Sequence, residues 1–528
     1  MLNSALTART LAQTITVAMF AMALSAGAKT LRWSTQGDPQ TMDPYSQNEN
    51  LTNNINGQVY EKLVDRDRQL NIVPVLALSW QQMGPQVWRF KLRPNVKFHD
   101  GTPFTADDVV FSLERSKHAN SQLRQYSNAV GTVVRIDDLT VELRQERPNP
   151  IVLEHLTTLP IMSRAWSVKN KAEKPLDFKN KEETYASKNS NGTGPFMLAS
   201  REPDIKTVLR RNPNWWGKFD GNVDEVIYRP IGADGTRIAA LLSGEVDVIL
   251  DPPPQDLARL RNNPAVKVVD GVENRVVFFG FDQFRDELLY SSVKGKNPFK
   301  DKRVRQAFYH AIDIDAIKAK TMRGQSFPTG ANTPSDKPST PEIEKRFPFD
   351  RVLAKKLLAE AGYPNGFEVT LDCPNNRYIN DEEICVAVAA MLAQLDVKLR
   401  VNALPKTTYF PKIEKNDTSM YMLGWGGAIT DAQTTLDPVL HSKDGKGKGD
   451  YNYGRYVNAK VDELGDLAAV ETNPEKRRGM IAEALLAHKN EFNNLPLHRQ
   501  VIPWATRSNV KLSHRADNWL EVAWVTID

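Results

Sequence analysis

The sequence VKFHDGTPFTADDVVFSLER, from Val96 to Arg115, runs from a short strand-like segment through a turn into a helix. Thr105, followed three residues later by Asp108, is a variant of the capping box with Asp in place of Glu, and it predicts the start of a helix. Val109 and Leu113 lie four residues apart, so they occupy one face of that helix. The segment therefore predicts a strand, a turn and an amphipathic helix in direct succession.

The same segment carries a cluster of polar side chains of the kind found in active sites and metal sites. His99, Asp100 and Gly101 form the predicted turn, and Gly101 is the position expected to need a positive φ. The carboxylates that follow lie at the positive end of the helix, where negative charge is stabilised by up to about 1 kcal/mol. Because each acidic residue has a local structural role, we interpret the cluster as scaffolding rather than as a catalytic or metal-binding site.

The length and charge of the chain limit its domain organisation and its possible partners. A chain of 528 residues is too long for a single core, so two or three domains are expected. The 69 Lys and Arg residues nearly balance the 64 Asp and Glu residues, and both signs are interspersed along the sequence. Because this pattern produces no extended field of one sign, nucleic acid is not an expected partner.

The first 28 residues have the pattern of an export signal. A basic segment ends at Arg9, an apolar run extends from about Ile15 to Ala26, and a small-x-small pattern ends at Ala28. The apolar run is well short of the ~20 residues that a membrane-spanning helix needs. We expect residues 1–28 to be a signal peptide cleaved after Ala28, and the mature protein to be periplasmic.

The chain contains two cysteines, Cys373 and Cys385. In an exported protein an even number of cysteines favours a disulfide, and a strand end followed by the first turns of a helix permits the pairing. Two buried free thiols remain an alternative, since free cysteines are commonly buried. A metal site is less favoured because no second Cys or His pair accompanies them.

The rear part of the sequence alternates helices and strands. Asp350 is a typical N-cap, and Gly362 ends the helix that it begins. A strand pattern at 367–371, a helix containing Ile384 and a strand pattern at 397–401 follow. Strand, helix and strand at this spacing predict a right-handed crossover in a parallel or mixed sheet.

The front part is richer in strands. Residues 87–93 alternate apolar and polar side chains, and residues 132–145 predict two strands about a turn at Asp137 and Asp138. Apolar residues four apart predict a helix over residues 53–64. Each part of the chain therefore contains the elements of its own α/β core.

Signatures of the common enzyme classes are absent from the sequence. It has no GxSxG, HExxH, GxxxxGK(S/T) or strand-following GxGxxG motif. The eight histidines are scattered, and none lies four residues from another. We therefore expect a protein that is not an enzyme and that uses no metal or cofactor.

Ten strings along the chain resemble the periplasmic solute-binding proteins of family 5, the peptide and nickel class that supplies ABC importers. They are similar to dipeptide- and oligopeptide-binding proteins and occur in the family's order over essentially the whole mature chain. The strings are TMDPY (41–45), VYEKLV (59–64), PVLALSW (74–80), WRFKLRPNVKFHDGTPFTADDVVFSLER (88–115), NGTGPFML (191–198), RRNPNWWG (210–217), LLSGEVDVI (241–249), NPFKDKRVRQAFYHAID (297–313), LLAEAGYPNGF (357–367) and LGWG (423–426).

This resemblance implies an α/β protein with mixed sheets, in which two lobes joined by two hinge strands enclose a ligand. It also implies an extra insert domain beside the first lobe. The implied boundaries are residues 29–71, 193–282 and 503–528 for lobe I, 72–192 for the insert domain, 283–502 for lobe II, and 276–282 and 496–504 for the hinge strands.

The resemblance also implies which residues bind the ligand. Arg377 occupies the place of an arginine that takes a peptide carboxylate, for which a planar guanidinium is well suited. Trp425 stands where the family has a pocket tryptophan, and Gly426 and Gly427 would let the backbone approach a ligand closely. Ser34, Thr35 and Gln36, after the first strand, would face them from lobe I.

One position departs from the dipeptide binders. They carry an aspartate three residues after the pocket tryptophan to hold the ligand's amino group, and this chain has Ala428 there. Asp431 is the nearest replacement, although it is equally suited to capping a turn. The departure makes a non-peptide ligand a real alternative.

We expect a receptor that captures an oligopeptide or a dipeptide-like solute and delivers it to the permease subunits of an ABC importer in the inner membrane. It is expected to be a monomer. The alternatives are a receptor for a metal chelate, an opine or an oligosaccharide and, more remotely, an exported hydrolase.

Overall fold

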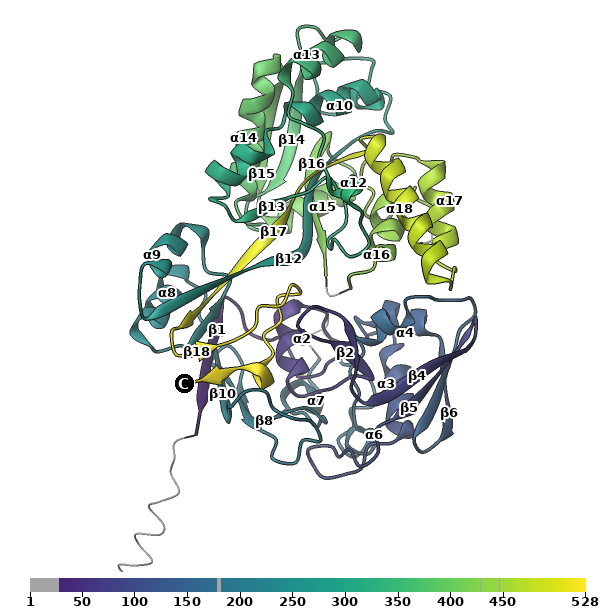
Figure 1. The fold of residues 1–528 in the computed structure, drawn as a ribbon, viewed down its shortest axis with the longest axis vertical. Helices are drawn as coiled ribbons and strands as arrows, with labels where there is room; N and C mark the ends of the chain where they lie inside the picture. Colours follow the sequence, from purple (N-terminus) through teal and green to yellow (C-terminus); the bar gives the residue numbers. More distant parts are fainter. Residues whose placement is uncertain (1–27, 178–181, 428, 446) are drawn as a thin grey trace, which may run out of the picture.

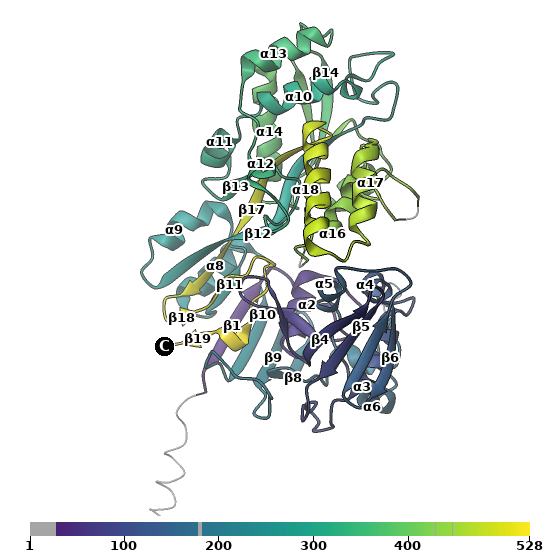
Figure 2. The same ribbon diagram turned by 45° about the vertical axis from the view of Figure 1, so that its right-hand side comes forward.

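The computed structural model describes residues 28–177, 182–427, 429–445 and 447–528. Figures 1 and 2 show two lobes, one above the other, and two long strands that run from one lobe into the other. These strands are β12 (Val266–Phe281) and β17 (Asn494–Arg507), which pair in antiparallel fashion. The predicted two-lobed α/β fold with two hinge strands is confirmed. The predicted signal peptide lies outside the described residues, apart from Ala28.

Because β12 and β17 belong to both lobes, the main sheet is continuous through the molecule. Its strand order is β15–β14–β16–β12–β17–β11–β1–β10–β9–β8, and β13 pairs with β17. The other strands of this sheet are β1 (Thr30–Thr35), β8 (Phe196–Glu202), β9 (Lys206–Arg211), β10 (Glu225–Pro230), β11 (Val248–Leu250), β13 (Ser326–Pro328), β14 (Glu368–Pro374), β15 (Lys398–Leu404) and β16 (Met420–Gly426).

In the upper lobe, β12 is buried on both faces. Val277, Phe279 and Phe281 belong to one apolar core, whereas Val276 and Phe278 belong to another. Successive side chains of a strand point to opposite faces, so a continuous apolar run such as VVFFGF supplies both cores at once. Helices cover both faces of this part of the sheet: α10 (Lys302–Ala311), α11 (Ile314–Ala316), α12 (Pro341–Glu344), α13 (Arg351–Glu360), α14 (Asp381–Leu392), α15 (Lys406–Glu414), α16 (Gln433–Thr435), α17 (Ala459–Ala468) and α18 (Pro474–Asn490).

The helix and strand predictions for this lobe are confirmed. Asp350 caps α13 by accepting a hydrogen bond from the Leu353 backbone N–H at 2.8 Å, and Gly362 has φ of 93° directly after the helix. The strands β14 and β15, on either side of α14, pair in parallel. The crossover predicted from their spacing therefore exists.

The lower lobe is built on β1, which pairs in parallel with both β10 and β11. Leu31 and Trp33 of β1 are fully buried in its core. Its helices are α2 (Asn50–Gly57), α8 (Asp234–Ser243) and α9 (Leu257–Arg261), and two small ribbons, β2 (Val64–Arg66) with β3 (Ile72–Pro74) and β18 (Val510–Lys511) with β19 (Thr526–Ile527), lie beside them.

The prediction of a helix over residues 53–64 is wrong in its position. The helix α2 begins at Asn50, after the N-cap Glu49, and ends at Gly57. Val59 and Leu63 are fully or almost fully buried beyond the helix, Val59 in a turn and Leu63 in a bend. Apolar spacing of four residues thus reflects burial in the core here and not one helical face.

A separate four-stranded sheet packs on the lower lobe. Its order is β4 (Ala77–Gly84), β5 (Val87–Leu92), β7 (Thr140–Arg144) and β6 (Thr132–Asp137). Its helices are α3 (Ala106–Ser116), α4 (Arg124–Val130), α5 (Val152–Leu156), α6 (Arg164–Lys169) and α7 (Tyr185–Lys188). Phe90 of β5 shares one apolar core with Trp33 of β1, so this sheet is anchored to the lobe below the hinge. The exact domain boundaries given above remain a prediction.

The polar cluster before α3 is scaffolding, as predicted. The Thr105 backbone N–H donates to Asp108 Oδ2 at 2.9 Å, and the Arg164 N–H donates to Asp108 Oδ1 at 2.9 Å. His99 Nε2 lies 3.0 Å from the Gly194 carbonyl oxygen, and Gly101 has φ of 86°. Within the described residues, no group of three or more His, Cys, Asp or Glu side chains is placed to hold a metal ion.

Cys373 at the end of β14 and Cys385 in α14 form a disulfide across 12 residues of chain, and both residues are fully buried. Closing a loop of this length is expected to stabilise the fold by about 3 kcal/mol through the unfolded state. Replacing both cysteines by alanine should lower the free energy of unfolding by at least that amount, as measured by urea denaturation. Labelling of the denatured protein with a thiol reagent should add two labels only after reduction; labels without reductant would contradict the disulfide.

Within the described residues, no helix has the length and apolarity that a membrane-spanning helix needs.

Candidate functional site

The pairing of β12 with β17 is interrupted where the chain passes from one lobe to the other. Val272 pairs with Val501 and Val276 pairs with Arg499, so three residues of β12, 273–275, lie opposite Gln500 alone. A β-bulge of this kind bends the strand and redirects its side chains. The junction between the lobes is therefore a break in the ladder, and its three side chains are directed away from regular sheet positions.

A cavity of about 650 Å³ lies beside this bulge. Both lobes, the four-stranded sheet domain and the hinge contribute to its lining. From the lower lobe come α2 and the loop 516–519, and from the sheet domain come α4, α5 and the segment after α5. The upper lobe contributes Pro334, Trp425, Gly426, Gly427, Ile429, Gln433, Thr434, Asp437, Pro438, Gly447 and Tyr451, and the hinge contributes Glu273, Asn274 and Arg275. A cavity closed by all of these parts changes shape whenever the lobes move.

The lower wall of the cavity carries a row of asparagines on one helix. Asn50, Asn53 and Asn56 are spaced three residues apart in α2, and all three line the cavity. Residues at this spacing lie on one face of a helix. Trp519 Nε1 donates to Asn50 Oδ1 at 2.6 Å, which fixes the indole against this helix. An amide carries both donors and an acceptor, so this wall is suited to polar main-chain groups.

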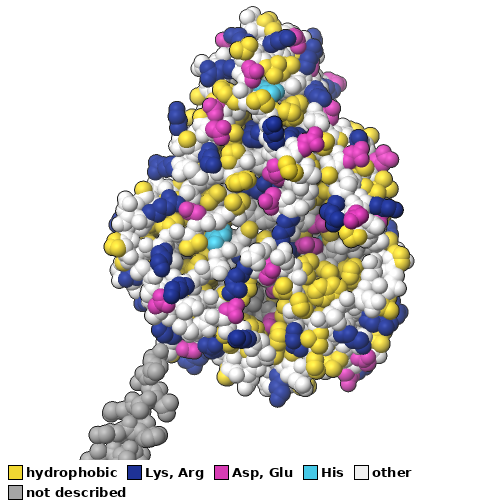
Figure 3. All heavy atoms as spheres, viewed as in Figure 1, with side chains coloured by type: hydrophobic (Ala, Val, Ile, Leu, Met, Phe, Trp, Pro, Cys, Tyr) yellow, Lys and Arg dark blue, Asp and Glu magenta, His cyan; other side chains and the backbone are white. Residues whose placement is uncertain are grey.

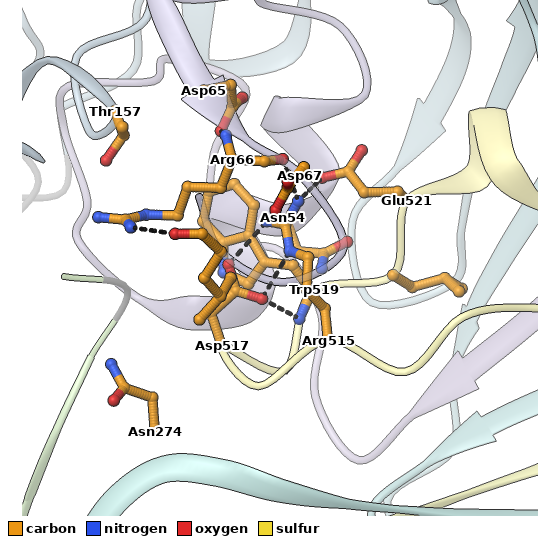
Figure 4. A network of polar contacts seen from close by, with 12 residues as sticks. Asn54, Asp65, Arg66, Asp67, Thr157, Asn274, Arg515, Asp517, Trp519 and Glu521 are labelled. Carbon is orange, nitrogen blue, oxygen red and sulfur yellow. Dashed lines mark hydrogen bonds and ion pairs between the residues drawn. The ribbon is translucent and has the colours of Figure 1, made fainter. Parts of the chain in front are cut away.

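The C-terminal loop behind this wall is held by a buried ionic network, which Figure 4 shows. The Arg515 guanidinium donates to both oxygens of Asp517 at 2.8 and 2.7 Å and lies 3.0 Å from Glu521 Oε1. Burial alone would lower the pKa of Arg515, but the two carboxylates outweigh it and raise that pKa. The network places Asp517 and Trp519 rigidly at the cavity.

Aromatic side chains form much of the upper wall. The Trp425 and Tyr451 rings lie 4.7 Å apart between centroids, and Trp425 Nε1 donates to the Thr434 carbonyl at 2.9 Å. The indole is half-buried, so one part of it faces the cavity. Trp425 and Gly426 therefore line the interlobe cavity, where the sequence resemblance implied a ligand contact.

The guanidinium of Arg377 lies close enough to the hinge bulge to interact electrostatically with Glu273 and Arg275. Its side chain is exposed, and its Cζ lies 5.2 Å from the Tyr378 ring centroid. The surrounding protein partly desolvates the guanidinium and Arg275 repels it, and both effects lower the pKa of Arg377. Among the described residues, no carboxylate lies within ion-pair distance of it. Arg377 is thus an exposed cation without an ion-pair partner among the described residues, and it does not belong to the cavity lining, although it lies within electrostatic reach of Arg275, which does.

Asp431 has a different partner from the one expected of it. Arg477 donates to both of its oxygens at 2.6 and 2.7 Å, and the Gln433 backbone N–H donates to Oδ1 at 2.8 Å. A carboxylate in such a bidentate pair is already neutralised. Asp431 is therefore a structural residue in this arrangement and does not replace the missing aspartate. Ala428, the position of that aspartate, lies outside the described residues.

The cavity lining does not include Thr35 or Gln36. The Thr35 hydroxyl lies 2.6 Å from the Tyr228 hydroxyl, and Gln36 is exposed. Ser34 is fully buried. The lower wall is formed instead by the row of asparagines of α2 and by the C-terminal loop, not by residues 34–36. The spacing of Asn50, Asn53 and Asn56 was the available sequence signal, because asparagine is a poor helix former and needs another reason to recur on one face.

His155 from α5 and Tyr126 from α4 are ionisable side chains that the sheet domain adds to the cavity lining. Burial lowers the pKa of His155 to about 4, against an opposing effect of Asp431. The imidazole is therefore neutral at pH 7, and its Nδ1 has no partner within the described residues. Outside the cavity, Figure 3 shows basic and acidic side chains scattered over the visible face of both lobes, without a large area of one sign.

Comparison with known proteins agrees with this architecture. Heme-binding protein A of Haemophilus influenzae is 28% identical over 480 residues, which cover 84% of this chain and 82% of the relative. Glutathione-binding protein GsiB of Escherichia coli O157:H7 is 26% identical over 451 residues, covering 83% and 82%. The solved structure of HbpA2 from Haemophilus parasuis is 23% identical, with a TM-score of 0.79, and covers 94% of this chain and 100% of that one.

The family model of the bacterial extracellular solute-binding proteins, family 5 (middle), matches residues 71–447. The match begins next to β3 and includes the hinge strand β12 and the upper-wall residues up to Gly447. The chain therefore belongs to the bacterial extracellular solute-binding proteins of family 5.

Proposed function

We propose that this protein is a periplasmic receptor that captures a small peptide between its lobes and delivers it to the permease of an ABC importer. The observation that carries the proposal is a cavity lined by both lobes and by the bulge that joins them. Family membership supports the receptor class, and the glutathione-binding relative is named for a tripeptide. The receptor acts as a monomer and changes no covalent bond of its cargo.

The physical basis of capture is closure of the lobes. Closure removes water from the ligand, and hydrogen bonds and ion pairs to it then act in a lower dielectric than in the open cavity. The asparagine row of α2 supplies donors and acceptors for an extended main chain, while Trp425, Tyr451 and Trp519 supply apolar surface for side chains. Such a site tolerates different side chains and selects for main-chain groups.

The proposal is tested by offering the purified protein a pool of tri- to pentapeptides and analysing bound and free material by mass spectrometry. Retention of intact peptides, together with a smaller radius of gyration by X-ray scattering, is the expected result. Retention of a different compound, such as a metal chelate, an opine or an oligosaccharide, would favour a non-peptide receptor. Cleavage products would indicate a hydrolase.

We further propose that Arg377 takes the terminal carboxylate of the peptide. Replacing Arg377 by alanine should weaken binding of a retained peptide by about 10- to 100-fold, since hydrogen bonds to charged groups contribute roughly 1.5–3 kcal/mol. Isothermal titration calorimetry measures the change. The matched control is Arg400→Ala, an exposed arginine of β15 that pairs with Glu368 at the sheet edge. The same peptide made as a C-terminal amide has no terminal carboxylate, so the substitution should change its affinity little. If Arg377→Ala weakened binding of the amide and the acid equally, Arg377 would not bind the carboxylate.

A further inference from the structure

The Lys and Arg side chains among the described lining residues of the cavity are Lys62 and Arg275. Lys62 Nζ lies 2.7 Å from Asp65 Oδ2 and 4.7 Å from the centroid of the Trp519 ring, and its side chain is 4% exposed. The ammonium group of Lys62 is therefore already paired with a carboxylate and covered by an indole. Arg275 differs from it in both respects.

Arg275 keeps the two terminal nitrogens of its guanidinium free. Its Nε donates to Glu273 Oε1 at 3.1 Å and to Glu273 Oε2 at 3.0 Å, whereas neither Nη1 nor Nη2 donates to any described residue. Both terminal nitrogens are accessible to solvent, and the side chain as a whole is 16% exposed. A guanidinium is a planar fork of N–H donors, and only the Nε donor is used here. A ligand that enters the cavity can therefore reach the unused part of the fork.

The carboxylates near Arg275 have other partners as well. Glu273 Oε2 also accepts from Gln500 Nε2 at 2.8 Å. Asp251 acts on Arg275 at longer range, but it is exposed and lies 3.2 Å from Asn518 Nδ2. Neither carboxylate accepts a hydrogen bond from Nη1 or Nη2 of Arg275. The outer edge of the guanidinium is therefore left for an acceptor from outside the chain.

A second guanidinium, that of Arg377, lies within electrostatic reach of Arg275. Partial desolvation and repulsion by Arg275 lower the pKa of Arg377. Asp381 attracts Arg377, but its Oδ2 already accepts from the backbone N–H groups of Arg377 and Tyr378 at 2.9 and 3.0 Å. Two like charges raise each other's energy, and each anion that binds beside them relieves the repulsion. The hinge bulge is therefore suited to two carboxylates, one for each guanidinium.

The positions of the two arginines differ along the path of a ligand. Arg275 belongs to the cavity lining, and Arg377 lies outside it. In the ladder between β12 and β16, Arg275 is opposite Gly426, beside the aromatic upper wall. A peptide whose end leaves the cavity toward Arg377 passes Arg275 with the residues before that end. A carboxylate side chain on one of these residues fits the planar fork in bidentate fashion.

We infer that the cargo is an acidic peptide and that Arg275 binds the carboxylate of one of its Asp or Glu side chains through Nη1 and Nη2. This inference rests on the proposed function, in which Arg377 takes the terminal carboxylate. It deepens that function by naming the chemical class of the peptide. Arg275 then determines specificity, because a neutral side chain at the same place forms only weaker hydrogen bonds with the guanidinium.

The test uses random tetrapeptide libraries in pairs, in which one position carries glutamate in one library and glutamine in the other. The purified protein receives both libraries in equal amounts, and every position is scanned in turn. Bound peptides are separated by ultrafiltration and counted by mass spectrometry. At one position at least, we expect the glutamate form to be enriched by about tenfold. Equal retention at every position would overturn the inference and leave the peptide receptor intact; retention of neither library would overturn both.

Substitution of Arg275 shows whether this residue causes the preference. In Arg275→Gln the ratio of bound glutamate to glutamine peptide should fall to about one or below, because Glu273 is then left to repel the ligand carboxylate. The double variant Glu273→Gln/Arg275→Gln removes that repulsion, so its ratio should be about one. Both peptides are measured on the same variant, and a smaller folded fraction therefore does not change the ratio.

The matched control is Arg400→Gln, which removes an exposed arginine of β15 and should keep the original ratio. A preference for glutamate that survives Arg275→Gln would contradict the role of Arg275.

A retained glutamate peptide, remade as a C-terminal amide, separates the role of Arg275 from that of Arg377. Arg275→Gln should weaken binding of the acid and of the amide equally, by about tenfold, because Arg275 binds the side chain. Isothermal titration calorimetry measures both affinities. A loss confined to the acid would assign the terminal carboxylate to Arg275 and refute the acidic-peptide inference.

Discussion

Replacing Asp43 by asparagine is expected to lower the free energy of unfolding by about 3–5 kcal/mol, because it leaves the Arg115 guanidinium buried without a counter-charge. Arg115 donates to both oxygens of Asp43 at 2.8 and 2.6 Å, and both side chains are 0% exposed. Asparagine has nearly the same shape, so the loss is one of charge and not of packing. Urea denaturation of the whole protein, followed by tryptophan fluorescence, measures this change in the free energy of unfolding.

The control for this substitution lies on the same helix. Glu114 of α3 pairs with Lys117 at 2.8 Å, with half of its side chain exposed. Glu114→Gln should change the free energy of unfolding by less than about 1 kcal/mol, since water screens exposed pairs. If the two substitutions cost the same, the buried pair is not a major source of stability in the lower lobe.

The second large effect is a loss of stability in acid. Burial lowers the pKa values of His99, His155 and His498 to about 4 and that of His488 to about 3. In the unfolded chain these imidazoles take up protons near pH 6.5. The stability that depends on neutral histidine is therefore present above pH 6.5 and is lost as the pH falls toward 4.

Two carboxyl groups oppose this trend, the buried Glu61 and the exposed Asp251. Burial raises the pKa of Glu61 to about 7, so it binds a proton in the folded state before it does so in the unfolded state, whereas solvent screens the smaller opposing effect of Asp251. The histidines outnumber them, and near pH 5.5 the unfolded state binds roughly two more protons, a slope of about 3 kcal/mol per pH unit. Urea midpoints at pH 7.5, 6.5 and 5.5 should fall in that order.

His488 provides the specific test of this explanation. Neither of its ring nitrogens has a hydrogen-bond partner among the described residues, and its ring lies 5.4 Å from that of Tyr456. His488→Leu should therefore leave stability at pH 7.5 nearly unchanged and reduce the slope by about 1.4 kcal/mol per pH unit. A slope equal to that of the unsubstituted protein would show that other groups cause the acid sensitivity.

The parts of the fold that the sequence predicts well are those with local causes. The capping box at Thr105 and the N-cap at Asp350 act within one turn of helix, and both occur as expected. The helix predicted over residues 53–64 failed because the burial of Val59 and Leu63 is imposed by the surrounding core and not by a helical face. Local chemistry can be read from neighbours in the sequence, whereas tertiary burial cannot.

The candidate site shows the same difference between features with local causes and features that depend on the folded chain. Trp425 and Gly426, named through the family resemblance, line the cavity, and their contact with a ligand stays a prediction. Asp431 was assigned from its closeness to Ala428 in sequence, but its partner Arg477 is 46 residues away, which no local pattern reveals. The lower wall combines α2 with the C-terminal loop near Trp519, and only the folded chain brings these segments together.

The bulge in β12 also bears on how the molecule opens. Three residues of β12 span the distance that Gln500 alone spans on β17. At the bulge, β12 therefore has more backbone torsion angles that can change than β17 has. A swing of the lobes should therefore pivot about β17, with the φ and ψ angles of 273–275 taking up the rotation. A solute that contacts Asn274, which lines the cavity, would restrain the segment that takes up this rotation as well as the two facing walls.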